Sequence, residues 1–134
     1  SFDQKVAEPI TLFARYGWQA PNAYDPAITD SDGNSYSLSN AWSAGISIDG
    51  KWWRRENDNF AVAVGQAMPS GKYRAAAAAG AKNELHLEAY YRLQINEHIA
   101  LSPDVQVVWN PFGGLAANNR GVITAFGLRT QIDL

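Results

Sequence analysis

The chain has 134 residues, 11 of them basic and 13 acidic, with a formal net charge of −2 and no cysteine. This length fits one small domain and argues against a two-domain enzyme. The charge balance gives no indication of a nucleic-acid partner, and the lack of cysteine excludes a disulfide framework or a cysteine-based zinc site. No apolar run approaches the ~20 residues of a membrane-spanning helix, whereas membrane β-barrels hide their apolar residues in alternation.

Apolar and polar residues alternate with a period of two in six segments, which predicts an all-β antiparallel meander of about six strands. The most regular segment is 83–95, where Leu85 and Leu87 face one way and Glu84 and His86 the other. The third segment is a weaker prediction because it is apolar on both faces at its start. The predicted strands cover residues 10–19, 42–49, 60–68, 83–95, 99–110 and 122–134.

The connections between the predicted strands alternate in length. Those after the first, third and fifth strands are long, and those after the second and fourth are short. Long outer loops alternating with short periplasmic turns are typical of outer-membrane barrels. The long connections are 20–39, 69–82 and 111–119, and the short ones are 50–58 and 96–98.

The polar side of these segments carries charges of both signs, and the apolar side carries none. Such a wall suits a water-filled channel, although a small soluble β-barrel or sandwich that binds a small ligand also alternates and stays an alternative. Pro103 lies within a predicted strand and, lacking an N–H donor, predicts a bulge or a local break in pairing. Aromatic residues near strand ends favour a lipid–water boundary. They are Trp18, Trp42, Trp52, Trp53, Tyr91, Trp109 and Phe126.

Several motifs resemble those of the carbohydrate-selective porins (OprB-like). Residues 83–95 are similar to that family's E-x-x-x-E-x-x-Y-R-x-Q strand, and residues 101–111 to its L-x-P-D-x-Q-Y-x-x-N-P segment. Residues 54–64 resemble its G-R-D-D-D-x-L-G-L-A-V turn and strand, and residues 127–134 its final strand. The resemblance extends from about Ala41 to the end, and it implies the C-terminal portion of such a porin.

The resemblance implies a segment of a transmembrane β-barrel in the outer membrane of a Gram-negative bacterium. It further implies passive diffusion of sugars, with no catalysis, cofactor or metal. The expected partners are carbohydrate substrates, outer-membrane lipid, and either the remaining barrel strands or other copies of the chain. Six strands cannot enclose a lumen, and an open edge in lipid leaves backbone groups unpaired. A structural fragment without independent function is a further alternative. The residues expected to contact sugars in the lumen are Arg15, Glu84, Glu88, Arg92, Asp104, Gln106 and Arg129.

Other chemistries fit less well. Glu84 and Glu88 are four residues apart on a strand, about 13 Å, which exceeds the ~6.5–9.5 Å of an inverting glycosidase pair. Residues 30–36 resemble the start of a calcium loop, but Ser35 and Ala41 stand where an EF-hand needs glycine and glutamate. A turn-rich outer loop is expected there instead. The two histidines make only a weak case for a metal site.

Overall fold

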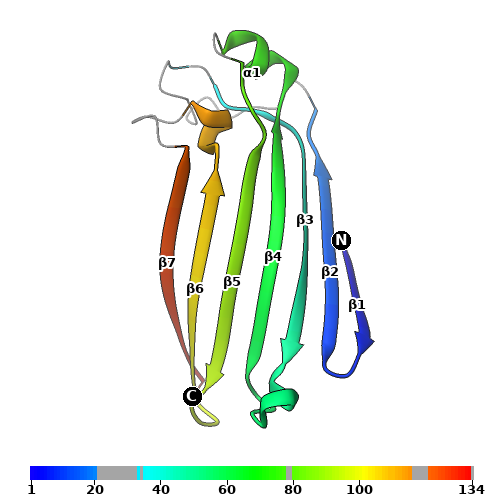
Figure 1. The fold of residues 1–134 in the computed structure, drawn as a ribbon, viewed down its shortest axis with the longest axis vertical. Helices are drawn as coiled ribbons and strands as arrows, with labels where there is room; N and C mark the ends of the chain where they lie inside the picture. The colour runs from blue at the N-terminus through cyan, green and yellow to red at the C-terminus, as the bar shows by residue number, and fades with distance from the viewer. Residues whose placement is uncertain (21–32, 34, 78–79, 116–120, 134) are drawn as a thin grey trace.

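A computed structural model describes residues 1–20, 33, 35–77, 80–115 and 121–133, and these form one antiparallel sheet. Each strand pairs with the next one in the sequence, so the predicted all-β meander is confirmed (Figure 1). No helix among the described residues is long and apolar enough to cross a membrane. The strands are β1 (Phe2–Ala7), β2 (Ile10–Trp18), β3 (Leu38–Asp49), β4 (Asn59–Pro69), β5 (Glu84–Gln94), β6 (Ile99–Trp109) and β7 (Val122–Ile132). The helices are η1 (Gly50–Trp53), α1 (Gly71–Ala76) and η2 (Pro111–Gly114).

The structure adds one strand to the six that the sequence predicts. In β1, Gln4 interrupts the apolar side between Phe2 and Val6, which weakens the alternation. The strand forms nevertheless, because it pairs with β2 from Phe2 to Lys5 before a bulge. β3 also begins earlier than predicted, at Leu38 rather than at residue 42. The alternation misses this part of the strand because polar Asn40 lies on its apolar side.

The apolar sides of the strands lie in register across the whole sheet. Cross-strand partners in antiparallel strands point to the same face, so rows of paired residues define each face. No Asp, Glu, Lys or Arg of the seven described strands belongs to the apolar face. One row of this face joins Leu12, Ile46, Val62, Ala89, Val105 and Phe126.

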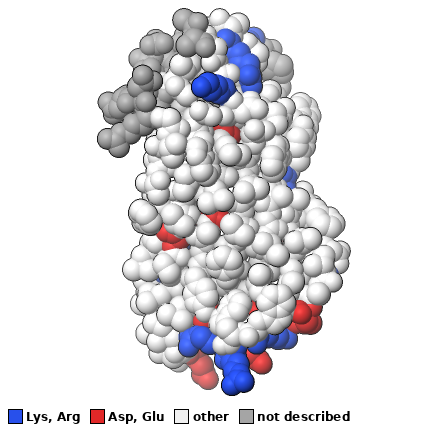
Figure 2. Space-filling view, in the orientation of Figure 1, with Lys and Arg blue, Asp and Glu red and all other residues white. Residues whose placement is uncertain are grey.

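The apolar face is not covered by a second layer in the described part of the chain, which consists of a single sheet. Phe126 is 82% exposed, and Leu128, Ile132 and Trp18 are also largely exposed. Figure 2 shows the charged side chains gathered at the two ends of the sheet, with few in the band between. A soluble sandwich would bury this face against another sheet, so the described strands have the architecture of a barrel wall.

The strand lengths match a membrane of ordinary thickness. Strands β4 to β7 each contain 11 residues. Ten steps of ~3.3 Å give about 33 Å along a strand, or about 25 Å of height at a barrel tilt of ~40°. That height equals the apolar band of an outer-membrane barrel.

Pro103 produces the predicted break in pairing. β6 pairs with β5 through Tyr90–Asp104 and Leu93–Leu101, with the pairs opposite Ser102 and Pro103 missing between them. The register is the same on both sides of this gap, so the ladder is interrupted without a bulge. Toward β7 the ladder is continuous.

Candidate functional site

The polar face of the sheet contains a hollow of ≈ 940 Å³ that extends over β1 to β5. Its floor is made of small residues on β3 and β4, the two strands between β2 and β5. Large side chains at these positions would fill the space above the sheet, so the small residues create the hollow. This also explains why β4 is apolar on both faces: its inner positions are small rather than charged. The floor residues are Ala41, Ser43, Ser47, Ala61, Ala63, Gly65 and Ala67.

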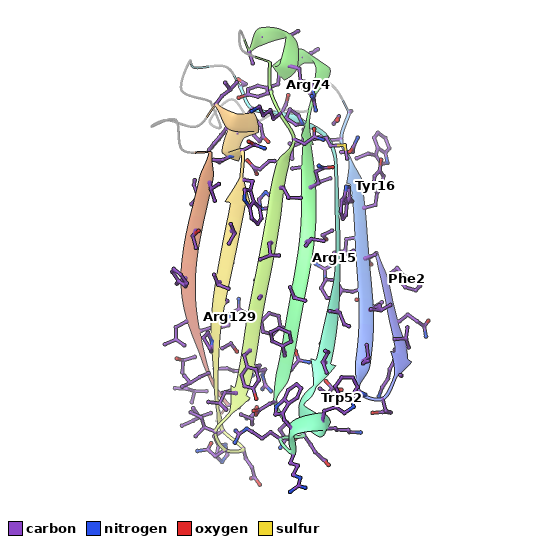
Figure 3. All side chains as sticks on the ribbon, in the orientation of Figure 1. Phe2, Arg15, Tyr16, Trp52, Arg74 and Arg129 are labelled. Carbon is purple, nitrogen blue, oxygen red and sulfur yellow. The ribbon has the colours of Figure 1, made fainter. Side chains whose placement is uncertain are left out.

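Each side of the hollow presents an aromatic and a charged side chain, and Asp3 of β1 adds a second charge beside β2. Phe13 and Arg15 of β2 form one side, and Glu88 and Tyr90 of β5 form the other. β2 and β5 are separated by the two floor strands, a span of about 14 Å at the ~4.8 Å spacing of neighbouring strands. Figure 3 shows Arg15 near one edge of the sheet and Arg129 of β7 near the other.

The charges in the middle of this face are not neutralised by one another. Among the described residues, Arg15, Glu88 and Arg129 take part in none of the ion pairs. Glu88 lies directly opposite Ala63 of β4 and Gln106 of β6, and Arg15 directly opposite Ser43. These charged groups therefore lie on the polar face without an ion-pair partner among the described residues.

Glu84 is placed differently, at the end of β5 nearest the long connections. Its two oxygens lie 2.6 Å from His86 Nε2 and 2.6 Å from the backbone N of Phe112, which donates to it. Glu84 thereby connects the sheet to η2. Glu84 and Glu88 share a strand face as predicted, but only Glu88 lines the hollow.

The other predicted lumen residues also lie on the polar face, outside the hollow. Arg92 donates to Asn57 O at 3.3 Å near the short connections. Gln106 Nε2 donates to Asp104 at 3.4 Å. A Cβ at residue 127 would lie 2.3 Å from Oδ2 of Asp104, so glycine at this position makes room for the carboxylate. Arg129 lies opposite Ser102.

At the short-connection end, Asp58 organises a compact network. Only 2% exposed, it accepts hydrogen bonds from Arg55, from Tyr91 Oη at 2.6 Å and from the backbone N of Gln94 at 2.9 Å. Trp53 Nε1 donates to Tyr91 Oη at 2.8 Å. Burial alone would raise the pKa of Asp58, but the hydrogen bonds from Arg55, Tyr91 and Gln94 outweigh it and lower the pKa to about 2.

At the opposite end, the long connections pack together around Tyr73. This side chain is 2% exposed, contacts Tyr36 edge-to-face at 5.0 Å, and donates to Phe112 O at 3.0 Å. Ser70 caps the N-terminus of α1 by accepting from Tyr73 N. Of the turn-rich segment predicted at 30–36, residues 30–32 and 34 lie outside the described residues.

Sequence reasoning did not single out Phe13 and Tyr90 as lining residues. The signal was available, since both are aromatic residues on the polar side of an alternating strand. No group of three or more His, Cys, Asp or Glu within the described ranges is arranged to hold a metal ion.

The uncharged apolar face, the charged polar face and the alternating long and short connections are all features of a porin wall. In such a wall the apolar face is the outer face and the polar face is the inner face. A family model for the carbohydrate-selective porins, OprB family, matches residues 1–134, the whole chain. The chain belongs to the OprB family. No curated protein and no solved structure gives a match.

The motifs quoted above support the resemblance from about residue 41 to the end of the chain. The family model also covers the residues before 41. Proteins of this family are carbohydrate-selective porins of the Gram-negative outer membrane. Membership therefore implies a channel for carbohydrates rather than an enzyme.

Proposed function

We propose that this chain forms part of the wall of an outer-membrane channel through which sugars diffuse passively. The observation that carries the proposal is the division of one single-layer sheet into an uncharged face and a charged face. Lipid tolerates only the first, because an arginine or lysine at the bilayer midplane costs about 2–4 kcal/mol and a carboxylate is also unfavourable there. The charged face is then left for water and solutes. Steric filtering and transient hydrogen bonds would come from Arg15, Glu84, Glu88, Arg92, Asp104, Gln106 and Arg129.

The seven strands form part of a larger barrel in this proposal. In the described part of the chain, β1 and β7 each pair on one side only. An unpaired edge in lipid leaves backbone N–H and C=O groups without partners, at a cost of several kcal/mol per group. Further strands, from the same protein or from other copies of the chain, would pair with both edges and complete the barrel.

A swelling assay tests the channel proposal. The complete barrel is reconstituted into liposomes loaded with an impermeant polymer and diluted into isosmotic glucose. We expect swelling that requires the protein, and an absence of glucose-dependent swelling by a correctly folded barrel would refute the proposal. Folding is checked independently by the heat-dependent mobility that β-barrels show on detergent gels.

Ion selectivity tests the assignment of the inner charges. Arg15→Gln removes a positive charge from the channel wall and is expected to make the channel more cation-selective, whereas Glu88→Gln is expected to do the opposite. Glu97→Gln lies in a short connection and serves as the control, with little change expected. Reversal potentials in a salt gradient measure all three, and a shift in the same direction for both test variants would contradict the assignment.

A further inference from the structure

The two aromatic side chains of the hollow, Phe13 and Tyr90, are unusual for the wet face of a barrel wall. Charged groups alone would hold polar solutes, and aromatic rings facing water gain nothing from hydration. Both rings lie at one hollow, on opposite sides of its small-residue floor. Their placement therefore favours a solute that has an apolar surface as well as polar groups.

Phe13 leans from β2 across the neighbouring strand. A Cβ built on Gly45, its direct partner in β3, would lie 2.4 Å from Phe13 Cζ. Glycine at 45 is therefore what allows the ring to lie over the floor of the hollow rather than stand away from the sheet.

Tyr90 leans toward the floor from the other side. Its hydroxyl donates to Asn59 Oδ1 of β4 at 3.2 Å, and Asn59 is in turn fixed by donating to Ser47 Oγ at 2.8 Å. Ala61, the direct partner of Tyr90, is only 3% exposed although it belongs to a single-layer sheet. The hydrogen bonds hold the ring in place, so a solute that packs against it does not have to order it.

Each ring has a charged neighbour two residues along the same strand. Arg15 follows Phe13, and Glu88 precedes Tyr90, so ring and charge point to the same side of the sheet. Neither charge has an ion-pair partner in the described ranges. The hollow thus combines two aromatic rings with the charged groups of Arg15, Glu88 and, from β1, Asp3.

We infer that Phe13 and Tyr90 make the hollow a subsite for cyclic sugars, which it distinguishes from open-chain polyols. A pyranose has a rigid ring with C–H groups that can pack on an aromatic face, while its hydroxyls bond to Arg15 and Glu88. An open-chain polyol of the same carbon number offers at least as many hydroxyls without that rigid apolar surface. This inference rests on the proposed channel function and adds a selectivity to it.

The test compares D-glucose with D-sorbitol, which have the same number of carbons. The complete barrel is placed in a planar bilayer, and the fall in potassium current is measured as either compound is added. The inference expects glucose to reduce the current at lower concentration than sorbitol. Phe13→Leu and Tyr90→Leu should each weaken the glucose effect by about two- to fivefold, the size expected for one ring contact, and leave sorbitol nearly unchanged.

Control variants separate ring packing from general damage. Tyr90→Phe keeps the ring but loses the hydrogen bond to Asn59, so it should retain the glucose preference with a smaller loss than Tyr90→Leu. Phe126→Leu removes a ring from the outer face and should have no effect. Should one leucine variant fail to fold, the other tests the same point. If glucose and sorbitol act equally in the original protein, or if both leucine variants keep the preference, the inference is overturned while the channel function stands. If neither compound enters or blocks the channel, the proposed function fails first.

Discussion

Replacing Asp58 by asparagine tests whether the network at the short-connection end stabilises the sheet. Asp58 accepts hydrogen bonds from three residues while almost fully buried, and an asparagine keeps the shape but loses the charge and one acceptor. Hydrogen bonds to charged groups contribute about 1.5–3 kcal/mol each, and a buried partner left unpaired costs about 1–3 kcal/mol. Arg55 is half exposed and can turn to water, which lowers the loss. We expect Asp58→Asn to reduce the free energy of unfolding by about 2–3 kcal/mol at pH 7.

The pH dependence of this loss has a definite sign. The pKa of Asp58 is about 2 in the folded chain, below the ~3.9 of an unfolded aspartate. A carboxyl group whose pKa falls on folding stabilises the folded state above its unfolded pKa, and this stabilisation is lost as pH falls toward the folded value. The difference between the original protein and Asp58→Asn should therefore be largest above pH 5 and should shrink between about pH 4 and pH 2.

Urea unfolding of the barrel in lipid vesicles, followed by tryptophan fluorescence, measures both effects. Asp133→Asn is the matched control, because Asp133 is exposed at the same end of the sheet and its side chain bonds only to Gln131 among the described residues. An Asp58→Asn loss no larger than that of the control would refute the reasoning. A loss equally large at pH 7 and pH 2.5 would refute the role of the charge.

Two further substitutions test the faces of the sheet and the packing of the long connections. Phe126→Arg places a charge near the middle of the outer face and should reduce the free energy of unfolding in vesicles by about 2–4 kcal/mol. Gln106→Arg places the same charge on the inner face and should cost much less. Equal losses for the two variants would contradict the orientation of the sheet. Gly113→Ala forces an L side chain to φ +71° and puts its Cβ 2.9 Å from that of Ala81, while Gly114→Ala has similar strain with nothing closer than 3.9 Å. Gly113→Ala should therefore speed limited proteolysis of the long connections more than Gly114→Ala does, and similar rates for the two variants would argue against the contact.

The sequence predicts the strands well where apolar and polar residues alternate with the two-residue period of an extended backbone. Segment 83–95 alternates without interruption, and β5 covers Glu84–Gln94. β1 is missed because a single glutamine breaks a short pattern, and only pairing with β2 along an edge stabilises the strand. Period-two alternation thus reports which face a residue occupies, and it fails where a strand depends on its neighbour more than on its own residues.

The candidate site is less accessible from sequence because its parts come from distant strands. Alternation places Arg15 and Glu88 on the polar face, but the hollow between them depends on the small residues of β3 and β4. Those of β4 make its segment look like a weak strand when it is read alone. The Asp58 network joins residues separated by 33 and 36 positions, and no local pattern predicts such contacts. Side-chain size across neighbouring strands, rather than polarity along one strand, determines where this wall is open.

A single-layer sheet has no core beneath its middle, so its side-chain interactions concentrate at the two ends. Asp58 and Arg55 pair at one end, Glu84 connects β5 to η2 at the other, and the buried cluster around Tyr73 also lies there. The charges between the ends, Arg15 and Glu88, have no such partners in the described part of the chain. Neutralising an end charge should therefore cost stability, whereas neutralising a central charge should change permeation at nearly constant stability. In the channel that we propose, stability and permeation therefore depend on different residues of the same wall.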